Sequence, residues 1–429
     1  MRERLARAAY TLLLRLAVPP YFARLWWRGA REAGYRSHWA ERLGWGRPGD
    51  AGRLWIHAVS LGETRAAAPL IAALREQRPG VRLLLTHGTA TGRAAGATLL
   101  QPADGQCWLP WDTPGAVRRF LRRQRPALGV LMETEVWPNL VHGAHAAGVP
   151  LVLANARLSA RSAAKGERYG ALLRPALAGI DLVLAQAPAD AERLRRGGAT
   201  RVEVAGNLKY DLVPEPALLD RGRRWRSALA RPVVLAANTR EGEEAALLRC
   251  WCDRAPGIAA GAPRPLLLIV PRHPQRFDAV AALVTAARLT LARRSAWGDE
   301  PPGRDASDVW LGDSLGEMPL YYAAADVALL GGSFEALGGH NLIEAAACGC
   351  PLIVGPHMFN FAAATELALE AGAVEQVADL DMAVQRALAM VAAPAATERA
   401  AWSARALAFA AGHRGAAQRM AGAVLALLR

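Results

Sequence analysis

The sequence predicts an α/β protein with two doubly wound parallel sheets. From residue 53 onward, short apolar runs of strand length alternate with Ala-rich, polar segments of helix length. This pattern is typical of parallel strands that are covered by helices on both faces. The alternation breaks once, at a proline-bearing stretch, and then restarts. The 429 residues suffice for two domains, and hydrophobic residues at 52% allow each a large core.

The apolar runs are expected to be the strands of the two sheets. In the first half they are residues 53–59, 81–87, 127–133, 150–156, 181–186 and 201–206. In the second half they are residues 232–238, 265–271, 289–294, 308–312, 326–332 and 351–355. Ligands of such sheets bind beyond the carboxyl ends of the strands, so the residues that follow the strands are the functional candidates.

The stretch LKYDLVPEPAL at residues 208–218 carries two prolines and is the best linker candidate. We therefore expect an N-terminal helical segment at 1–45, a Rossmann-like domain at 46–210 and a second one at 211–429. The last helix is a candidate to return to the first domain. Two such domains facing a cleft form the GT-B arrangement of nucleotide-sugar transferases. Phosphatases, epimerases and synthases share it, so the fold does not fix the chemistry.

The N-terminal segment is basic, because residues 1–42 hold nine Arg against three Glu. Its apolar run, residues 8–23, contains Arg15 and two prolines. As a helix this run would reach about 24 Å, which is short of a bilayer core of about 30 Å. No convincing signal-peptide cleavage site follows it.

On a helix, at ~100° per residue, the basic and apolar residues of this segment separate onto different faces, and aromatic residues follow. These are Arg4, Arg7 and Arg15 on one face, Leu5, Leu12 and Leu16 on another, and then Tyr21, Phe22, Trp26 and Trp27. Such a helix suits a monotopic anchor on an anionic membrane surface. The alternative is a first helix that packs on the core and leaves its basic face in solvent.

The composition excludes several classes of protein. Lys+Arg total 52 and Asp+Glu 38, for a net charge of +14, but lysine occurs only at Lys165 and Lys209. The excess of Arg suggests codon bias, and Lys165 has no assigned role. Five cysteines in a long chain argue against a secreted disulfide scaffold and indicate reduced thiols in a cytoplasmic protein. No run of eighteen apolar residues exists, which excludes a multi-span membrane protein.

The net charge also raises the alternative of a nucleic-acid-binding protein, since basic patches bind phosphates. One short segment is especially rich in arginine, with Arg118, Arg119, Arg122, Arg123 and Arg125. The chain has no recognised nucleic-acid module, however.

Glu63 follows the first expected strand, in HAVSLGET at 57–64. It falls in the first turn of the next helix, where the helix dipole favours a carboxylate and the side chain faces the ligand edge. Such a Glu can act as the general base that removes a proton from an acceptor hydroxyl. The alternative is an ordinary first-turn Glu, because helix N-termini are rich in acids.

Two further candidates end other strands of the first half. Glu133 and Glu135 lie two apart in METEVWPN and are expected to point to the same side, where they could bind sugar hydroxyls or a cation. They could equally be the region before a helix. Lys209 in GNLKYD offers a compact ammonium that could aid a phosphate leaving group. It could also be a solvated linker lysine.

The second half offers residues for a nucleotide. Arg272 follows a strand in VPRHPQRF, and the backbone of 316–318 lies at an expected helix start. Glycine pairs in GGSFEALGGHN allow a close approach to a ligand, before a helix N-terminus that could bind phosphate. Glu344 in that helix begins an E-A-x-x-x-G-x-P pattern that recurs in GT-B nucleotide-sugar enzymes, where the Glu binds ribose hydroxyls. Thr239 is a possible N-cap.

No strong metal constellation is present in the sequence. His142 and His145 are three apart, but no third ligand lies nearby, which favours a surface pair. Asp379 and Asp381 form a D-x-D at the start of the terminal helices, where capping by Asp is the better interpretation.

Together these motifs resemble the 3-deoxy-D-manno-oct-2-ulosonic acid (Kdo) transferases of lipopolysaccharide synthesis. The matching motifs follow the family order across residues 1 to about 370. They are GYRSHWAERLG, HAVSLGE, METEVWPN, NARLS, GNLKYD, VPRHPQRF, LGEM and GGSFEALGGHN. The chain departs from the family at Asn238-Thr239-Arg240, where Ser-Thr-His is usual, and at Ala345, where Pro is usual.

The resemblance implies transfer of Kdo from CMP-Kdo to a phosphorylated lipid A precursor, by inverting displacement without a metal or further cofactor. It implies that Glu63 is the proton acceptor and that Glu133 and Lys209 assist the transition state. The implied CMP contacts are Pro271, Arg272, Gly316, Glu317, Met318, Asn341, Leu342, Ile343 and Glu344. It also implies anchoring by the N-terminal helix at the cytoplasmic face of a Gram-negative inner membrane. A GT-B enzyme that uses a UDP-sugar is the alternative.

Overall fold

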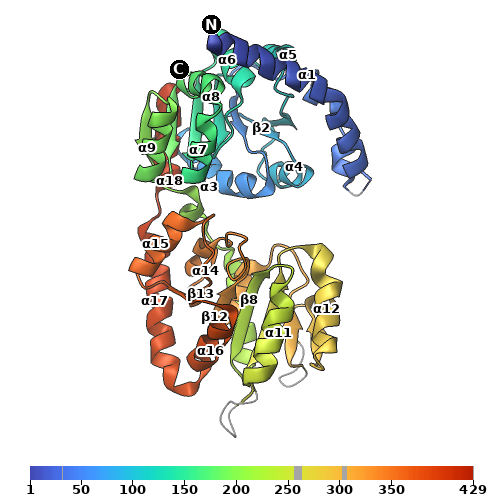
Figure 1. Ribbon diagram of the computed structural model, residues 1–429, viewed down its shortest axis with the longest axis vertical. Helices are drawn as coiled ribbons and strands as arrows, with labels where there is room; N and C mark the ends of the chain where they lie inside the picture. Colours follow the sequence, from blue (N-terminus) through green and yellow to red (C-terminus); the bar gives the residue numbers. More distant parts are fainter. Residues whose placement is uncertain (31, 256–262, 302–306, 429) are drawn as a thin grey trace. The chain divides into compact units, whose positions relative to one another are not determined.

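The computed structural model describes residues 1–30, 32–255, 263–301 and 307–428. These residues form two α/β units. The first comprises Met1–Leu212 together with Arg414–Arg429, and the second Val213–His413. The chain leaves the first unit within the stretch 208–218 and returns to it for the last helix, so both termini belong to that unit (Figure 1). All five cysteine thiols are free.

The first unit is built on a parallel seven-stranded sheet with the order β3-β2-β1-β4-β5-β6-β7. Its strands are β1 Leu54–His57, β2 Leu83–His87, β3 Gly105–Trp108, β4 Leu128–Met132, β5 Leu151–Ala156, β6 Leu182–Ala185 and β7 Val202–Val204. Its helices are α1 Arg2–Arg28, α2 Trp39–Arg42, α3 Leu61–Gln77, α4 Ala90–Ala97, α5 Pro114–Gln124, α6 Pro138–Ala146, α7 Ala160–Glu167, α8 Gly170–Ala178, α9 Pro188–Gly197 and α18 Ala416–Leu427.

Side chains of this sheet alternate between two apolar cores, as the period of a strand requires. Leu54 and Ile56 of β1 pack with α3 and α18 on one face, where Met420 and Val424 are buried. Trp55 packs with α5 and α6 on the other face. The return of α18 therefore completes the first core, because it covers strands that α3 alone leaves partly open.

The second unit repeats the topology, with the parallel order β10-β11-β9-β8-β12-β13-β14. Its strands are β8 Val233–Thr239, β9 Leu266–Pro271, β10 Leu291–Arg293, β11 Val309–Leu311, β12 Val327–Leu330, β13 Leu352–Val354 and β14 Val374–Gln376. Its helices are α10 Pro216–Ala228, α11 Glu243–Arg254, α12 Phe277–Ala286, α13 Met318–Ala324, α14 Leu342–Ala347, α15 Ala362–Glu370, α16 Leu380–Val391 and α17 Ala396–Gly412.

The predicted α/β class is confirmed, but the sequence did not indicate β3 and β14. Both lie at the edge of a sheet, and neither is a continuous apolar run, since β3 reads GQCW and β14 reads VEQ. A strand that is buried on both faces shows itself as an apolar run, whereas an edge strand need not. The predicted strands were also one or two residues too long at several ends.

Helix α1 packs across the ends of α5 and α6 through a polar inner face. The Tyr10 hydroxyl donates to Asp112 at 2.9 Å, and Thr11 Oγ1 donates to Asn139 Oδ1 at 3.2 Å. Further along, the Tyr21 ring stacks on Trp111, and Arg42 donates to the Tyr21 hydroxyl at 3.0 Å. The first helix is therefore fixed to its unit by specific bonds.

The outer face of α1 is apolar and exposed. Leu5, Leu12 and Leu16 are 62%, 59% and 67% exposed, and Trp27 is 80% exposed. At ~100° per residue these positions lie within an arc of about 60°, opposite the inner face. The helix packs on its unit with basic residues in solvent, as the alternative interpretation expects, and its exposed face also carries leucines. In the described part of the chain, no helix is both long and apolar enough to span a bilayer.

Candidate functional site

Glu63 lies where β1 ends and α3 begins, and the turn fixes its carboxylate. Ser60 is the N-cap of α3, and its hydroxyl accepts from the Glu63 amide at 3.3 Å. In return the Glu63 carboxylate accepts from the Val59 amide at 2.8 Å and from the Ser60 hydroxyl at 3.1 Å. Glu63 thus has the bonds of a first-turn acid, and these same bonds orient it.

The pKa of Glu63 is raised from 4.5 to about 7, which separates it from an ordinary capping acid. Burial is the largest cause, and the negative charges of Glu135 and Glu133 add to it. A carboxyl group whose pKa lies near neutrality is half ionised at physiological pH and can both take and release a proton. A partly buried carboxyl group of this kind is a candidate general base.

Glu133 and Lys209 form an ion pair at the same edge of the sheet. Glu133 follows β4 in the left-handed backbone region at φ 56°, and its carboxylate is 3.6 Å from Lys209 Nζ. Both side chains are about one-fifth exposed. Lys209 lies on the 3-10 turn Leu208–Asp211, so the residue is part of an ordered turn rather than a solvated linker.

Asn155, which sequence reasoning did not single out, holds the turn that carries Lys209. It ends β5 in the left-handed region at φ 54° and is fully buried, and its Oδ1 accepts from the Leu208 amide at 3.0 Å. Non-glycine residues adopt this conformation at some expense, so it marks a position that the surroundings hold in place. A buried Asn at the end of an apolar strand was the available signal.

His57 was also missed, although it is a fully buried polar residue at the end of β1. Its Nδ1 is 3.1 Å from the Thr86 carbonyl oxygen, which only accepts, so this contact favours the tautomer with the proton on Nδ1. Burial lowers the pKa of His57 to about 3 and keeps the ring neutral.

In that tautomer, the unprotonated Nε2 of His57 lies opposite the Glu135 carboxylate, which is also a hydrogen-bond acceptor. The nitrogen has no hydrogen-bond partner in the described residues and lies 4.0 Å from Glu135 Oε2. Glu135 also accepts from the Trp137 indole at 2.8 Å, and burial raises its pKa. Two hydroxyl groups of a sugar, each donating one hydrogen bond, would satisfy both acceptors.

In the second unit, cationic side chains gather after β8 and β9. Arg272 follows β9, and its amide donates to the Thr239 carbonyl at 3.0 Å. The charges of Arg272 and Arg240 both act on His340, whose pKa falls to about 4 chiefly because of burial. Pro271 ends β9 with its side chain buried. Two arginine side chains beside a partly buried histidine suit an anionic ligand.

The segment Gly316–Met318 offers backbone rather than side-chain groups. Gly316 is left-handed at φ 84° and precedes α13. The Glu317 carboxylate accepts from Arg294 at 3.0 Å through both oxygens and also pairs with Arg221. Because its carboxylate is already bound, the Glu317 side chain has a structural role in this state.

Asn341–Glu344 form the start of α14. Asn341 is the N-cap and accepts from the Ile343 amide at 3.2 Å. Leu342 and Ile343 have buried side chains, so only their backbone could reach a ligand. Glu344 stands in the first turn and is partly exposed.

Glu243, a further buried acid, ties the two glycine-rich turns of this edge together. Both of its carboxylate oxygens accept from the Gly332 amide at 2.8 Å, and one accepts from the Arg240 amide at 2.9 Å. The expectation that Thr239 caps α11 is wrong, because Gly242 is the N-cap. The Thr239 hydroxyl instead donates to Glu244 at 3.2 Å, since β8 continues through Thr239 and the helix begins later.

The remaining candidates behave as local structure. Asp379 is the N-cap of α16 and accepts from the Met382 amide, as predicted. His142 and His145 both lie on α6. No group of three His, Cys, Asp or Glu residues that could hold a metal ion occurs among the described residues.

Comparison with known proteins identifies the family. Residues 37–212 match the family model of 3-deoxy-D-manno-octulosonic-acid transferase (kdotransferase). A 3-deoxy-D-manno-octulosonic acid transferase of Bordetella pertussis is 50% identical over 97% of this chain and 98% of its own length. The chain belongs to the Kdo transferases. The transferase of Haemophilus influenzae is 36% identical over 89% of this Kdo transferase and 90% of its own length.

Solved structures place this Kdo transferase in the GT-B fold. Anabaena HepE in complex with UDP and glucose matches at 14% identity with a TM-score of 0.57, over 87% of this chain and 99% of that one. UDP-GlcNAc 2-epimerase from Neisseria meningitidis matches at 12% identity with a TM-score of 0.57, over 88% and 99%. At these identities the likeness concerns the fold alone. The Kdo transferase thus acts as a glycosyltransferase of lipopolysaccharide biosynthesis on this fold.

Proposed function

We propose that this Kdo transferase uses CMP-Kdo as donor and a phosphorylated lipid A precursor as acceptor, with inversion at the anomeric carbon. The acceptor oxygen forms the new bond to that carbon while the bond to the CMP phosphate breaks and its electron pair leaves with CMP. The hydroxyl proton goes to the Glu63 carboxylate. One observation carries the proposal: Glu63 is fixed by two hydrogen bonds and has a pKa of about 7.

The neighbours of Glu63 have roles in the same step. Lys209, paired with Glu133 at 3.6 Å, supplies a positive charge beside the acids of this edge. In the proposed reaction this pair steadies the charge that develops on the reacting oxygens. His57 and Glu135 would orient the acceptor by accepting one hydrogen bond each from two of its hydroxyl groups.

The donor is proposed to bind in the second unit. Its phosphate and carboxylate are both anions, and Arg272 and Arg240 are the cations that face this edge. Pro271, Gly316–Met318 and Asn341–Leu342–Ile343–Glu344 would contact the nucleotide, mostly through backbone groups. Cationic side chains would thus neutralise the leaving CMP without a metal ion, and no further cofactor is needed.

Mass spectrometry of the products tests the proposal directly. The purified enzyme is incubated with the tetraacyl lipid A precursor and with CMP-Kdo, UDP-glucose or UDP-N-acetylglucosamine in parallel. A lipid product that gains the mass of one or more Kdo units from CMP-Kdo alone is expected. Transfer from a UDP-sugar, or addition of Kdo to a non-lipid acceptor instead, would overturn the assignment.

We further propose that α1 attaches the enzyme to the cytoplasmic face of the inner membrane of a Gram-negative bacterium. The support is the exposed stripe of Leu5, Leu12 and Leu16, which flanks basic residues on a helix fixed to its unit. Leu12→Glu with Leu16→Glu should abolish sedimentation with vesicles that contain phosphatidylglycerol. Leu407→Glu, at an exposed leucine of the second unit, is the matched control. Unchanged sedimentation of the double variant would contradict the proposal.

A further inference from the structure

A groove of about 700 Å³ lies between α1, α5 and α6. Five arginines line it: Arg4, Arg7 and Arg15 from α1, and Arg118 and Arg122 from α5. No Asp or Glu is among the lining residues. Its lining runs from Pro114 and Asn139, in the first turns of α5 and α6, to Ala146 and Ala147 at the end of α6.

The arginines of α5 divide into two sets with different surroundings. Arg119 and Arg123 donate to the carbonyls of Leu43 and Gly46 at 2.6 to 2.9 Å, and both lie over the Trp45 ring. They hold the segment before β1 in place. The run of arginines that suggested nucleic-acid binding is therefore not one continuous basic surface.

Arg118 and Arg122 have no such partners. In the described part of the chain, neither they nor the three arginines of α1 that line the groove form a hydrogen bond or an ion pair. Elsewhere in the first unit, cations such as Arg75 and Arg93 are paired with carboxylates at 2.5 and 2.7 Å. The groove thus brings together five guanidinium groups without an Asp or Glu in its lining, and an anion bound there would be attracted by all of them.

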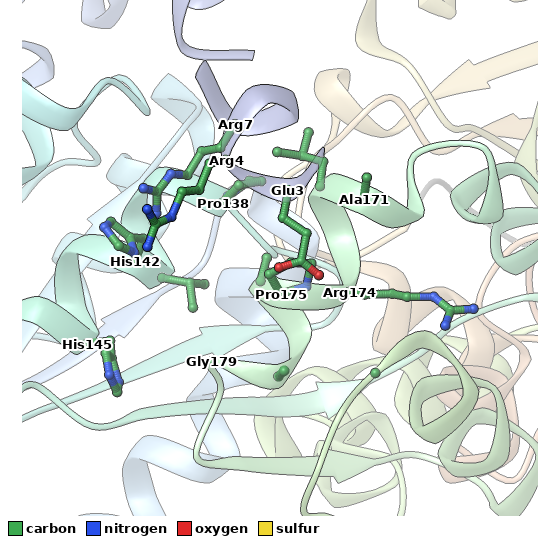
Figure 2. Close-up of a pocket in the computed structure, with 15 residues that line it drawn as sticks. Glu3, Arg4, Arg7, Pro138, His142, His145, Ala171, Arg174, Pro175 and Gly179 are labelled. Atoms are coloured by element: carbon green, nitrogen blue, oxygen red, sulfur yellow. The ribbon is translucent and has the colours of Figure 1, made fainter. Parts of the chain in front are cut away.

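A neighbouring hollow shares part of the groove's wall but includes an acid. It has about 630 Å³, lies between α1, α6 and α8, and shares Arg4, Arg7 and His142 with the groove. Figure 2 shows Arg4 and Arg7 beside His142, with the Glu3 carboxylate turned into the same hollow. Arg4 and Arg7 are thus shared with a hollow that includes an acid, whereas Arg15, Arg118 and Arg122 line the groove alone.

The wall of the groove also has an apolar rim. Leu12 lines the groove and is 59% exposed, and Leu5 and Leu16 continue the same stripe of α1. An occupant that suits both surfaces has an anionic head and apolar chains. A volume of this size admits one headgroup rather than a polymer.

We propose that the groove binds the phosphate headgroup of one anionic bilayer phospholipid, with its acyl chains along the leucine stripe of α1. The inference rests on the proposed attachment of α1 to the membrane and adds a stoichiometric lipid site to it. The proposed occupant is a bilayer lipid rather than the acceptor, because none of Glu63, Glu133 and Glu135 lines the groove.

The test uses the full-length enzyme and two charge-matched double variants. Arg118→Glu with Arg122→Glu reverses the charge of two arginines that line the groove. Arg161→Glu with Arg168→Glu reverses the charge of two exposed arginines around α7. Soluble dihexanoylphosphatidylglycerol, below its micelle concentration, is titrated into each protein by calorimetry. We expect one site in the wild type and the α7 variant, and at least tenfold weaker binding in the groove variant. Equal loss in both variants would overturn the proposal, as it would indicate a diffuse charge effect.

Two further measurements are needed. One distinguishes a lipid phosphate from inorganic phosphate, and the other distinguishes the groove proposal from the proposal that α1 attaches to the membrane. Inorganic phosphate that saturates the groove as tightly as the lipid would show an anion site without lipid specificity and would overturn the inference. The Leu12→Glu, Leu16→Glu variant should keep at least part of the headgroup binding but lose vesicle sedimentation. If vesicles bind through α1 while the soluble lipid does not bind at all, the groove proposal fails and membrane attachment stands.

Arg118→Gln with Arg122→Gln guards against a folding defect, since it removes charge without adding acids. It should also weaken lipid binding, and its thermal unfolding should match that of the wild type. Transfer of Kdo to a detergent-dispersed acceptor should stay within twofold in both groove variants. A loss of that activity at unchanged stability would assign these arginines to the acceptor and overturn the bilayer-lipid inference.

Discussion

The two units share one topology but carry opposite charges at the carboxyl ends of their strands. The first unit gathers Glu63, Glu133 and Glu135, with Lys209 paired to Glu133. The second gathers Arg240 and Arg272 beside His340, and its buried acid Glu243 is bound to backbone amides. The same fold therefore supplies proton abstraction at one edge and anion binding at the other. Changes at the two edges should consequently affect different kinetic constants.

The largest expected effect is that of Glu63→Gln. The amide keeps the size of the side chain but cannot take a proton, so kcat should fall roughly 10²- to 10⁴-fold. The affinity for CMP, measured by calorimetry, should not change, because the donor residues belong to the other unit. Transfer near the wild-type rate would contradict the role of base. A parallel loss of CMP binding would contradict the proposal that the first unit supplies the base and the second unit binds the donor.

The next largest effect is expected from Arg272→Gln at the donor edge. A hydrogen bond to a charged group contributes about 1.5 to 3 kcal/mol, so KM for CMP-Kdo should rise roughly 10- to 100-fold. The KM for the lipid acceptor should stay near its wild-type value. Steady-state kinetics with each substrate varied in turn checks both. A rise confined to the acceptor KM would be incompatible with the assignment.

Most residues that distinguish the acidic edge of the first unit from the cationic edge of the second could be predicted from the sequence. The properties that could not be predicted depend on the folded structure. Glu63 could be found because it directly follows an apolar strand in a motif that opens a helix. Its raised pKa could not, because that depends on burial and on Glu135, seventy-two residues away along the chain. His57 was hidden for a similar reason: a histidine inside an apolar run shows neither its unsatisfied nitrogen nor the carboxylate opposite it.

The pH dependence of the reaction should be set by the acidic edge. Glu63 is the base only when ionised, so kcat/KM should rise with pH through about 7. The negative charge of Glu135 raises the pKa of Glu63, so Glu135→Gln should move this limb to lower pH by up to about one unit. The pH profile of kcat/KM for the lipid acceptor gives the measurement.

Arg240→Gln is the matched control for this shift, since it changes a charge at the other edge only. Its acid limb should coincide with that of the wild type. A limb that stays at the same pH in Glu135→Gln would show that another group than Glu63 titrates. An acid limb of the pH profile that moves equally in Glu135→Gln and Arg240→Gln would also show that a group other than Glu63 titrates.

The smallest effect is expected from Arg240 itself, and it concerns the donor. This arginine stands where the family usually has histidine, and its partly exposed side chain acts on His340 and His273 together with Arg272. A partly exposed charge is screened by solvent, so Arg240→Ala should raise KM for CMP-Kdo only roughly two- to fivefold. Arg240→His should lie between the alanine variant and the wild type. If Arg240→Ala raised the KM for CMP-Kdo more than Arg272→Gln does, Arg240 would be the main anion-binding residue, because both side chains are proposed to bind the same donor.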